Sequence, residues 1–95
     1  MKKLYSSELV FMSDNSNTNM GFALANVCNF LKKLNSEKSQ LNLTNMNMTD
    51  TTHGVINLNI CTDDNNLLNI LKQIKKYLQD IKNNYNMLKI QILIK

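Results

Sequence analysis

The side chains that could carry out chemistry are few, and they form no recognisable set. His53 is the only histidine, and Cys28 and Cys61 are the two cysteines. Paired zinc ligands are usually separated by about two to four residues, and no such pair is present. A solvated turn residue is the simplest interpretation of His53, and reduced thiols, with Cys28 in the core, are the simplest interpretation of the cysteines. We therefore predict no metal site in this chain.

Asp63 and Asp64 are adjacent carboxylates that could share a proton in acid–base catalysis. They stand directly before a stretch with helical periodicity, where a carboxylate accepts hydrogen bonds from the first amides of a helix. The sequence contains no nucleophile–base pair, no glycine-rich phosphate loop and no HExxH motif. We therefore interpret the aspartates as capping residues and predict no catalytic residue.

The composition narrows the possible classes of protein and partner. The chain has 95 residues, of which 43% are hydrophobic, and this predicts one folded domain over residues 1–95. The net charge is +4, but all the basic residues are lysines, which are scattered along the sequence. Without arginine there is no bidentate group for phosphate or guanine, so the charge does not favour a nucleic-acid partner. No apolar run reaches the roughly 18 residues of a membrane span and no signal-peptide core is present, so we expect a cytoplasmic protein without membrane contact.

The spacing of the apolar residues changes along the chain and predicts six elements, which polar loops at 14–19 and 35–40 help to separate. The expected order is a strand over 7–13, a helix from residue 20, strands over 41–48 and 55–61, a helix that opens at 62–66, and a strand over 87–94. The second helix should bury a stripe of Leu67, Leu71, Ile74, Leu78 and Ile81, widened by Leu68, Ile70 and Tyr77.

The stretch NMNMTDTTHGVINLNIC (45–61) is rich in asparagine, yet its apolar residues alternate as they do in half-buried strands. We interpret it as a β-hairpin with Gly54 in the turn, available for a positive φ. Leu43 and Met46 are out of phase with each other, and either a β-bulge near residues 44–45 or a later start of the strand would reconcile them.

The order β-α-β-β-α-β predicts a ferredoxin-like α+β fold, in which a four-stranded antiparallel sheet carries both helices on one face. This fold has many functions and indicates none by itself. The acylphosphatase version needs an arginine, the metal-chaperone version needs a CxxC motif in the first loop, and the RNA-recognition version needs aromatic residues on the third strand. None of these features is present. A small regulatory or scaffolding module remains.

Residues 45–81 resemble the ACT domain of the small regulatory subunit of acetolactate synthase (acetohydroxyacid synthase), in its short single-domain form. The matching residues are Met46-Asn47-Met48, the alternating Ile56, Leu58 and Ile60, and Gln73-Ile74, Lys76 and Asp80-Ile81. The resemblance implies a non-catalytic subunit that pairs with a second copy and activates a large catalytic subunit. That large subunit would use thiamine diphosphate, Mg²⁺ and FAD to condense pyruvate with a second 2-oxo acid, and no cofactor is expected on this chain.

The same resemblance points to an effector loop before the first helix. Valine-responsive members carry an N-x-P-G-V turn there, and Asn17, Asn19 and Gly21 are the corresponding candidates in this chain. The proline is missing and the loop is longer, so the resemblance carries over the fold and the subunit role but not a response to valine.

Two other interpretations stay open. One is an RNA-associated protein of ribosomal type with the same β-α-β-β-α-β plan, which would suit the isoelectric point near 9.2. The other is an asparagine-rich protein that shares the fold without sharing either function.

Overall fold

The computed structural model describes residues 2–14, 18–37 and 40–94. Six elements follow one another along the chain: β1 (Lys3–Met12), α1 (Met20–Glu37), β2 (Gln40–Asp50), β3 (His53–Thr62), α2 (Asp64–Asn84) and β4 (Lys89–Ile94). The predicted β-α-β-β-α-β order is confirmed.

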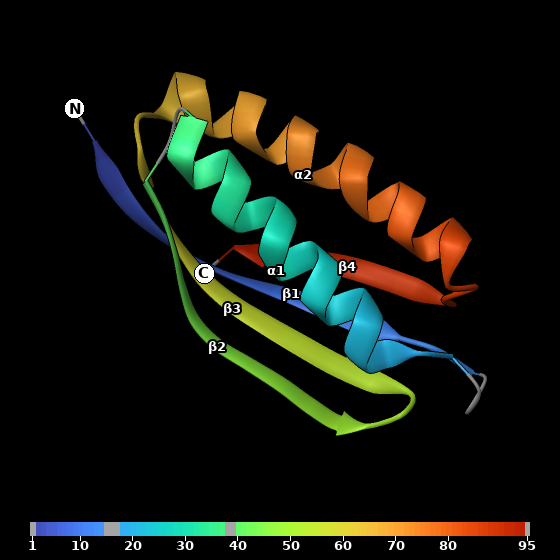
Figure 1. The fold of residues 1–95 in the computed structure, drawn as a ribbon. Helices are drawn as coiled ribbons and strands as arrows, with labels where there is room; N and C mark the ends of the chain where they lie inside the picture. The colour runs from blue at the N-terminus through green and yellow to red at the C-terminus, as the bar shows by residue number, and fades with distance from the viewer. Residues whose placement is uncertain (1, 15–17, 38–39, 95) are drawn as a thin grey trace.

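The strands form one antiparallel sheet in the order β2-β3-β1-β4, and both helices lie on the same face of it (Figure 1). This is the predicted ferredoxin-like fold. β1 lies between β3 and β4, so it is an inner strand whose backbone groups are paired on both edges. Neither helix of the described residues is long and apolar enough to cross a membrane.

The core fills the layer between the helices and the sheet. Phe11 of β1, Val27 of α1 and Ile56 of β3 have no exposed surface. Burying one such side chain contributes about 1.5–3 kcal/mol, so this layer is the main source of stability. The remaining buried apolar residues are Leu9, Met20, Ala23, Leu24, Cys28, Leu31, Leu34, Leu41, Leu58, Ile60, Ile70, Ile74, Leu78, Ile81 and Met87.

The predicted hairpin and its β-bulge are both confirmed. β2 pairs with β3, and the register shifts between Leu43 and Asn45. Leu43 is opposite Leu58, and Met46 is opposite Ile56. Because Leu58 and Ile56 both face the helices, the bulge brings Leu43 and Met46 to the same side of the sheet.

The predicted role of Gly54 is wrong. The turn is formed by Thr51 and Thr52, whereas Gly54 is buried within β3, and no described glycine has a positive φ. A Cβ at Gly54 would lie 2.8 Å from Leu24 Cδ1. Glycine is needed here because the first turns of α1 pack directly against the strand, not because the backbone turns.

The polar connection predicted at 35–40 is also wrong. α1 continues to Glu37 and β2 begins at Gln40. Asn35 then helps to start the next strand, since its Oδ1 accepts a hydrogen bond of 2.8 Å from the amide of Leu41.

All four strands begin at other residues than predicted, with β2 beginning at Gln40 instead of residue 41 and β3 at His53 instead of residue 55. β1 begins at Lys3 instead of residue 7, because Tyr5 already pairs with Ile60 of β3. β4 begins at Lys89, after a short turn that includes Asn86 at a φ of 52°.

The buried stripe of α2 is narrower than predicted. Ile70, Ile74, Leu78 and Ile81 are buried, whereas Leu68 is 63% exposed. The other predicted members, Leu67, Leu71 and Tyr77, are half-buried. The four buried residues recur every three or four positions and so occupy one side of the helix, which is the side that faces the sheet.

Candidate functional site

The N-terminal end of α1 holds the predicted effector-loop residues, of which Asn17 lies outside the described residues. Asn19 caps the helix, because its Oδ1 accepts a hydrogen bond of 3.3 Å from the amide of Phe22. The amide of Met20 donates to the carbonyl of Thr18 at 2.9 Å. Two of the amides that could hold a carboxylate effector are therefore engaged by the chain itself.

Gly21 lies between these two engaged amides and is exposed. A Cβ built on it would have no heavy atom within 4 Å, so the space around it does not require glycine. The structure thus brings Asn19 and Gly21 together at one exposed helix end. Their role as effector-loop residues stays a prediction.

The two aspartates before α2 are engaged in structural contacts. Asp63 is the N-cap, as predicted: its Oδ1 accepts a hydrogen bond of 2.8 Å from the amide of Asn66. Asp64 accepts a hydrogen bond from the hydroxyl of Tyr5 and lies 3.5 Å from Lys3 Nζ. The Tyr5 hydrogen bond and the Lys3 charge lower the pKa of Asp64. A general acid needs a raised pKa, so this arrangement does not suit acid–base chemistry.

The turn between β2 and β3 gathers an aspartate, a threonine and a histidine. Asp50 Oδ1 accepts hydrogen bonds from the Thr52 hydroxyl at 2.6 Å and the Thr52 amide at 2.7 Å, and these bonds lower the pKa of Asp50 to about 2. Nδ1 of His53 lies 2.8 Å from Thr52 Oγ1 and 3.3 Å from Asp50 Oδ1. A catalytic relay needs the two ring nitrogens to face different partners, whereas here one nitrogen faces both. The cluster is a hydrogen-bonded turn, and His53 is exposed as predicted.

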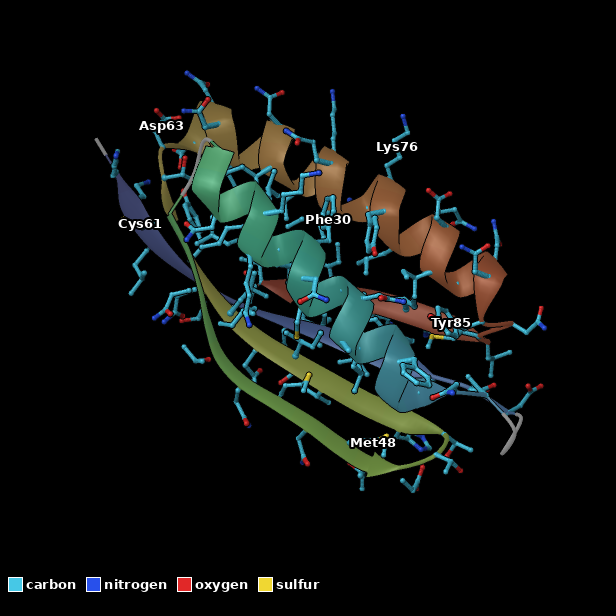
Figure 2. The ribbon with its side chains drawn as sticks, viewed as in Figure 1. Phe30, Met48, Cys61, Asp63, Lys76 and Tyr85 are labelled. Atoms are coloured by element: carbon cyan, nitrogen blue, oxygen red, sulfur yellow. The ribbon has the colours of Figure 1, made fainter. Side chains whose placement is uncertain are left out.

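The two cysteines are far apart in the structure and both are free. Cys28 is buried in α1, where burial raises the pKa of its thiol, and its Sγ lies 3.3 Å from Met46 Sδ. Cys61 is on β3 at the opposite end of the hairpin from Met48 (Figure 2). In the described parts of the chain, no three His, Cys, Asp or Glu side chains come together as metal ligands would.

The face of the sheet that carries no helix, which we call the open face, has a polar half over β2 and β3 and a half over β1 and β4 that exposes apolar side chains. We call the latter the apolar half, although Ser6, Glu8 and Gln91 also lie on it. Leu4 and Leu93 on this face are 66% and 41% exposed, and Val10 is opposite Val55. Asparagines dominate over β2 and β3. The open face is formed by Leu4, Ser6, Glu8, Val10 and Met12 of β1, Val55, Asn57, Asn59 and Cys61 of β3, Asn42, Asn45 and Asn47 of β2, and Gln91 and Leu93 of β4.

A groove of about 340 Å³ lies between α2 and the edge strand β4. We call it the lysine groove; it is lined by Lys75, Leu78, Gln79, Lys82, Lys89, Ile90 and Ile92. No acidic side chain lines it, and none of the ion pairs found among the described residues involves its lysines. Reasoning from sequence missed this site. The available signal was the spacing of Lys75 and Lys82, which at seven residues is two helical turns and places both on one side of α2.

The comparisons with known proteins concern the fold. No family model matches the chain, and no curated protein matches it. A protein from Burkholderia cenocepacia assigned to the amidohydrolases/peptidases matches with a TM-score of 0.69 and 12% sequence identity, over 99% of this chain and 27% of that one. A hydantoinase/carbamoylase family amidase from Burkholderia ambifaria matches with a TM-score of 0.68 and 8% identity, over 99% of this chain and 27% of that one.

This chain therefore spans about a quarter of the length of each of these two proteins. At such low identities the likeness concerns the course of the backbone and not the side chains of a site. What the comparisons establish is that the chain is a small ferredoxin-like domain with the same fold as one part of larger amidohydrolase/peptidase and amidase chains.

Proposed function

We propose that this chain is a non-catalytic regulatory subunit that binds and activates a larger enzyme, as the small subunit of acetolactate synthase does. The observation that carries the proposal is the open face. Its apolar half exposes Leu4 and Leu93, although a sheet face exposed to water is normally polar. A covering partner would remove this surface from water. The potential acid–base groups, in contrast, are engaged in caps and turns.

The residues that resemble the acetolactate synthase subunit support this choice of enzyme. Three of the matching residues in α2 are polar, namely Gln73, Lys76 and Asp80. They line one hollow of about 290 Å³ together with Phe30 and Tyr77. The two aromatic rings stack with centroids 4.1 Å apart, between the two helices, while Lys76 points away from the sheet (Figure 2). The matching polar residues thus share one surface instead of being scattered around the helix.

The partner in this proposal is a large catalytic subunit that holds thiamine diphosphate, Mg²⁺ and FAD and condenses pyruvate with a second 2-oxo acid. This chain supplies a docking surface and no group that touches the substrate. The fold is compatible with such a role, since it makes up about a quarter of two longer enzyme chains. The resemblance does not carry over a response to valine, and the residues on which such a response would depend are the predicted effector-loop residues Asn17, Asn19 and Gly21.

The test is reconstitution with a cognate large subunit and measurement of acetolactate by a colour assay. The chain alone should convert no pyruvate, and its addition should raise acetolactate formation. Val10→Lys combined with Leu93→Lys should weaken activation at least about tenfold, because it places two charges on the apolar half of the open face. Asn57→Lys combined with Asn59→Lys on β3 is the matched control, which adds the same charge to the polar half and should leave activation within about twofold.

Two further measurements complete this test. A Gly21→Asp variant should retain activation and change only the effect of added valine, if the effector-loop prediction is right. Failure of the two chains to co-purify, together with no activation, would contradict the proposal.

We also propose that two copies of this chain pair through the edge strand β2. Met46 and Met48 of this strand are 52% and 46% exposed, and β2 contains no lysine that would repel a second copy. Pairing would cover both methionines and the unpaired backbone groups of the edge. Sedimentation should show a dimer that Met48→Lys weakens, and a stable monomer at high micromolar concentration would contradict the pairing.

A further inference from the structure

The lysine groove lies beside backbone groups that have no partner strand. β4 is the last strand of the sheet and pairs only with β1 among the described strands. In an antiparallel edge strand, every second residue directs its N–H and C=O away from the sheet. An extended segment of another protein could satisfy these groups by adding a strand next to β4.

The charges of the groove select the chemistry of such a segment. Lys75 and Lys82 lie about 10 Å apart along the axis of α2, since the helix rises about 1.5 Å per residue. Lys89, at the start of β4, lines the same groove. Because no carboxylate of the described chain neutralises these ammonium groups, carboxylates of the partner segment would do so.

The floor of the groove adds a second requirement. Leu78 is buried, and Ile90 and Ile92 are half-buried and face the helix side of the sheet. In an added strand, side chains at positions i, i+2 and i+4 point to one face and span about 13 Å, close to the separation of the two helical lysines. The middle side chain would lie over the apolar floor, and the outer two would reach the lysines.

We propose that the lysine groove binds an extended segment of a partner protein with the pattern acidic-x-apolar-x-acidic, which pairs with β4 as a fifth strand. A second copy of this chain does not fit, because its own groove would bring lysines against lysines. RNA fits poorly as well. No aromatic side chain lines the groove to stack on bases, and the floor is aliphatic.

The probe is the fluorescein-labelled peptide Thr-Glu-Thr-Leu-Thr-Glu-Thr, titrated with the full chain and followed by fluorescence anisotropy. Binding should weaken as the salt concentration rises, because the ion pairs are exposed. The peptide should perturb amide resonances of β4 and α2 in NMR spectra. Perturbation confined to β2 or to the open face would overturn the proposal.

The charge requirement has a matched pair of variants. Lys75→Glu, Lys82→Glu and Lys89→Glu together should weaken binding about tenfold or more, because the two glutamates of the peptide lose their modest ion pairs and then face carboxylates. The control reverses Lys32, Lys72 and Lys76, which are exposed and do not line the groove, and binding should stay within about twofold. Circular dichroism establishes that both triple variants are folded. An equal loss in the two variants would mean attraction by net charge alone and would overturn the proposal.

Strand addition is tested with the peptide backbone. N-methylation of alternate peptide residues should abolish binding in one register and be tolerated in the register shifted by one residue, because only one set of amides faces β4. Loss in neither register would contradict a fifth strand. Displacement of the peptide by a generic RNA oligonucleotide that binds more tightly would assign the groove to nucleic acid and overturn the proposal. This result is independent of activation by the chain, because no large subunit takes part in the measurement.

Discussion

The two sides of the helix layer are closed to different degrees. On the side of β2 and β3, α1 approaches so closely that a Cβ on Gly54 would lie 2.8 Å from Leu24 Cδ1, and Cys28 Sγ is 3.3 Å from Met46 Sδ. On the side of β4, α2 leaves the lysine groove of about 340 Å³. Beneath α1 the helix and the sheet fit closely, whereas α2 and β4 leave apolar surface and positive charge between them for a partner.

The side chains of the two helices explain this difference. The buried face of α1 includes Ala23, Val27 and Cys28, which are small and allow the helix axis to come near the sheet. The buried face of α2 consists of larger side chains, namely Ile70, Ile74, Leu78 and Ile81. α1 also buries large side chains, but only α1 places small residues between them, so α2 lacks such points of close approach to the sheet.

The largest expected effect comes from truncating an isoleucine to alanine, once beneath α1 and once at the lysine groove. Ile56→Ala removes a fully buried side chain beneath α1 and should lower the free energy of unfolding by about 2–5 kcal/mol. Ile92→Ala lies at the lysine groove, where the side chain is only half-buried, and should cost about 1 kcal/mol. Urea unfolding of both variants checks this. Equal losses would mean that the two sides are equally well packed.

A smaller loss is expected where α1 meets the sheet most closely. Gly54→Ala should lower the free energy of unfolding by about 1–3 kcal/mol, because the new methyl group overlaps Leu24 and also approaches Met20 Sδ to 3.2 Å. Thermal unfolding monitored by circular dichroism measures this effect. An unchanged or raised Tm would show that Leu24 can move aside and that α1 is not tightly fitted.

The sequence predicted the fold well. It hardly predicted the difference in how closely α1 and α2 pack against the sheet. Alternation and helical spacing are local, so they located the hairpin, and the phase slip between Leu43 and Met46 correctly located the bulge. The role of Gly54 depends on Leu24 of α1, which is thirty residues away in the sequence, and no local pattern reveals that contact. The lysine groove depends likewise on the distance between α2 and β4. Periodicity assigns a residue to a face, but the fit between two faces is set by the volumes of all the side chains between them.

The other described glycine provides a gain of stability as a contrast. Gly21 lies in α1 with no heavy atom within 4 Å of a Cβ position, so Gly21→Ala should raise the free energy of unfolding by about 0.5–1 kcal/mol. The gain comes from the reduced backbone freedom of the unfolded chain. Urea unfolding of both variants should show a higher free energy of unfolding for Gly21→Ala and a lower one for Gly54→Ala, although the chemical change is the same. Destabilisation by Gly21→Ala would indicate a close contact with a part of the chain outside the described residues.

The smallest expected effect concerns the charge of Asp50 at the turn between β2 and β3. Hydrogen bonds from the Thr52 hydroxyl and amide hold the pKa of Asp50 at about 2, below its ordinary value of 3.8. A lowered pKa in the folded state means that the ionised carboxylate stabilises the fold above pH 3.8, and that this contribution is lost as the pH falls through about 2. Asp50→Asn should therefore lower the Tm slightly at pH 6, and the difference from the unmodified chain should shrink towards pH 2. Asp80→Asn, on the exposed side of α2, is the control, and its Tm difference should change less over the same range.

A difference for Asp50→Asn that stays constant from pH 6 to pH 2 would mean that the turn does not depend on the charge of Asp50. The side of β2 and β3 would then differ from the lysine groove only in how closely its side chains pack, and not in whether its charges are paired.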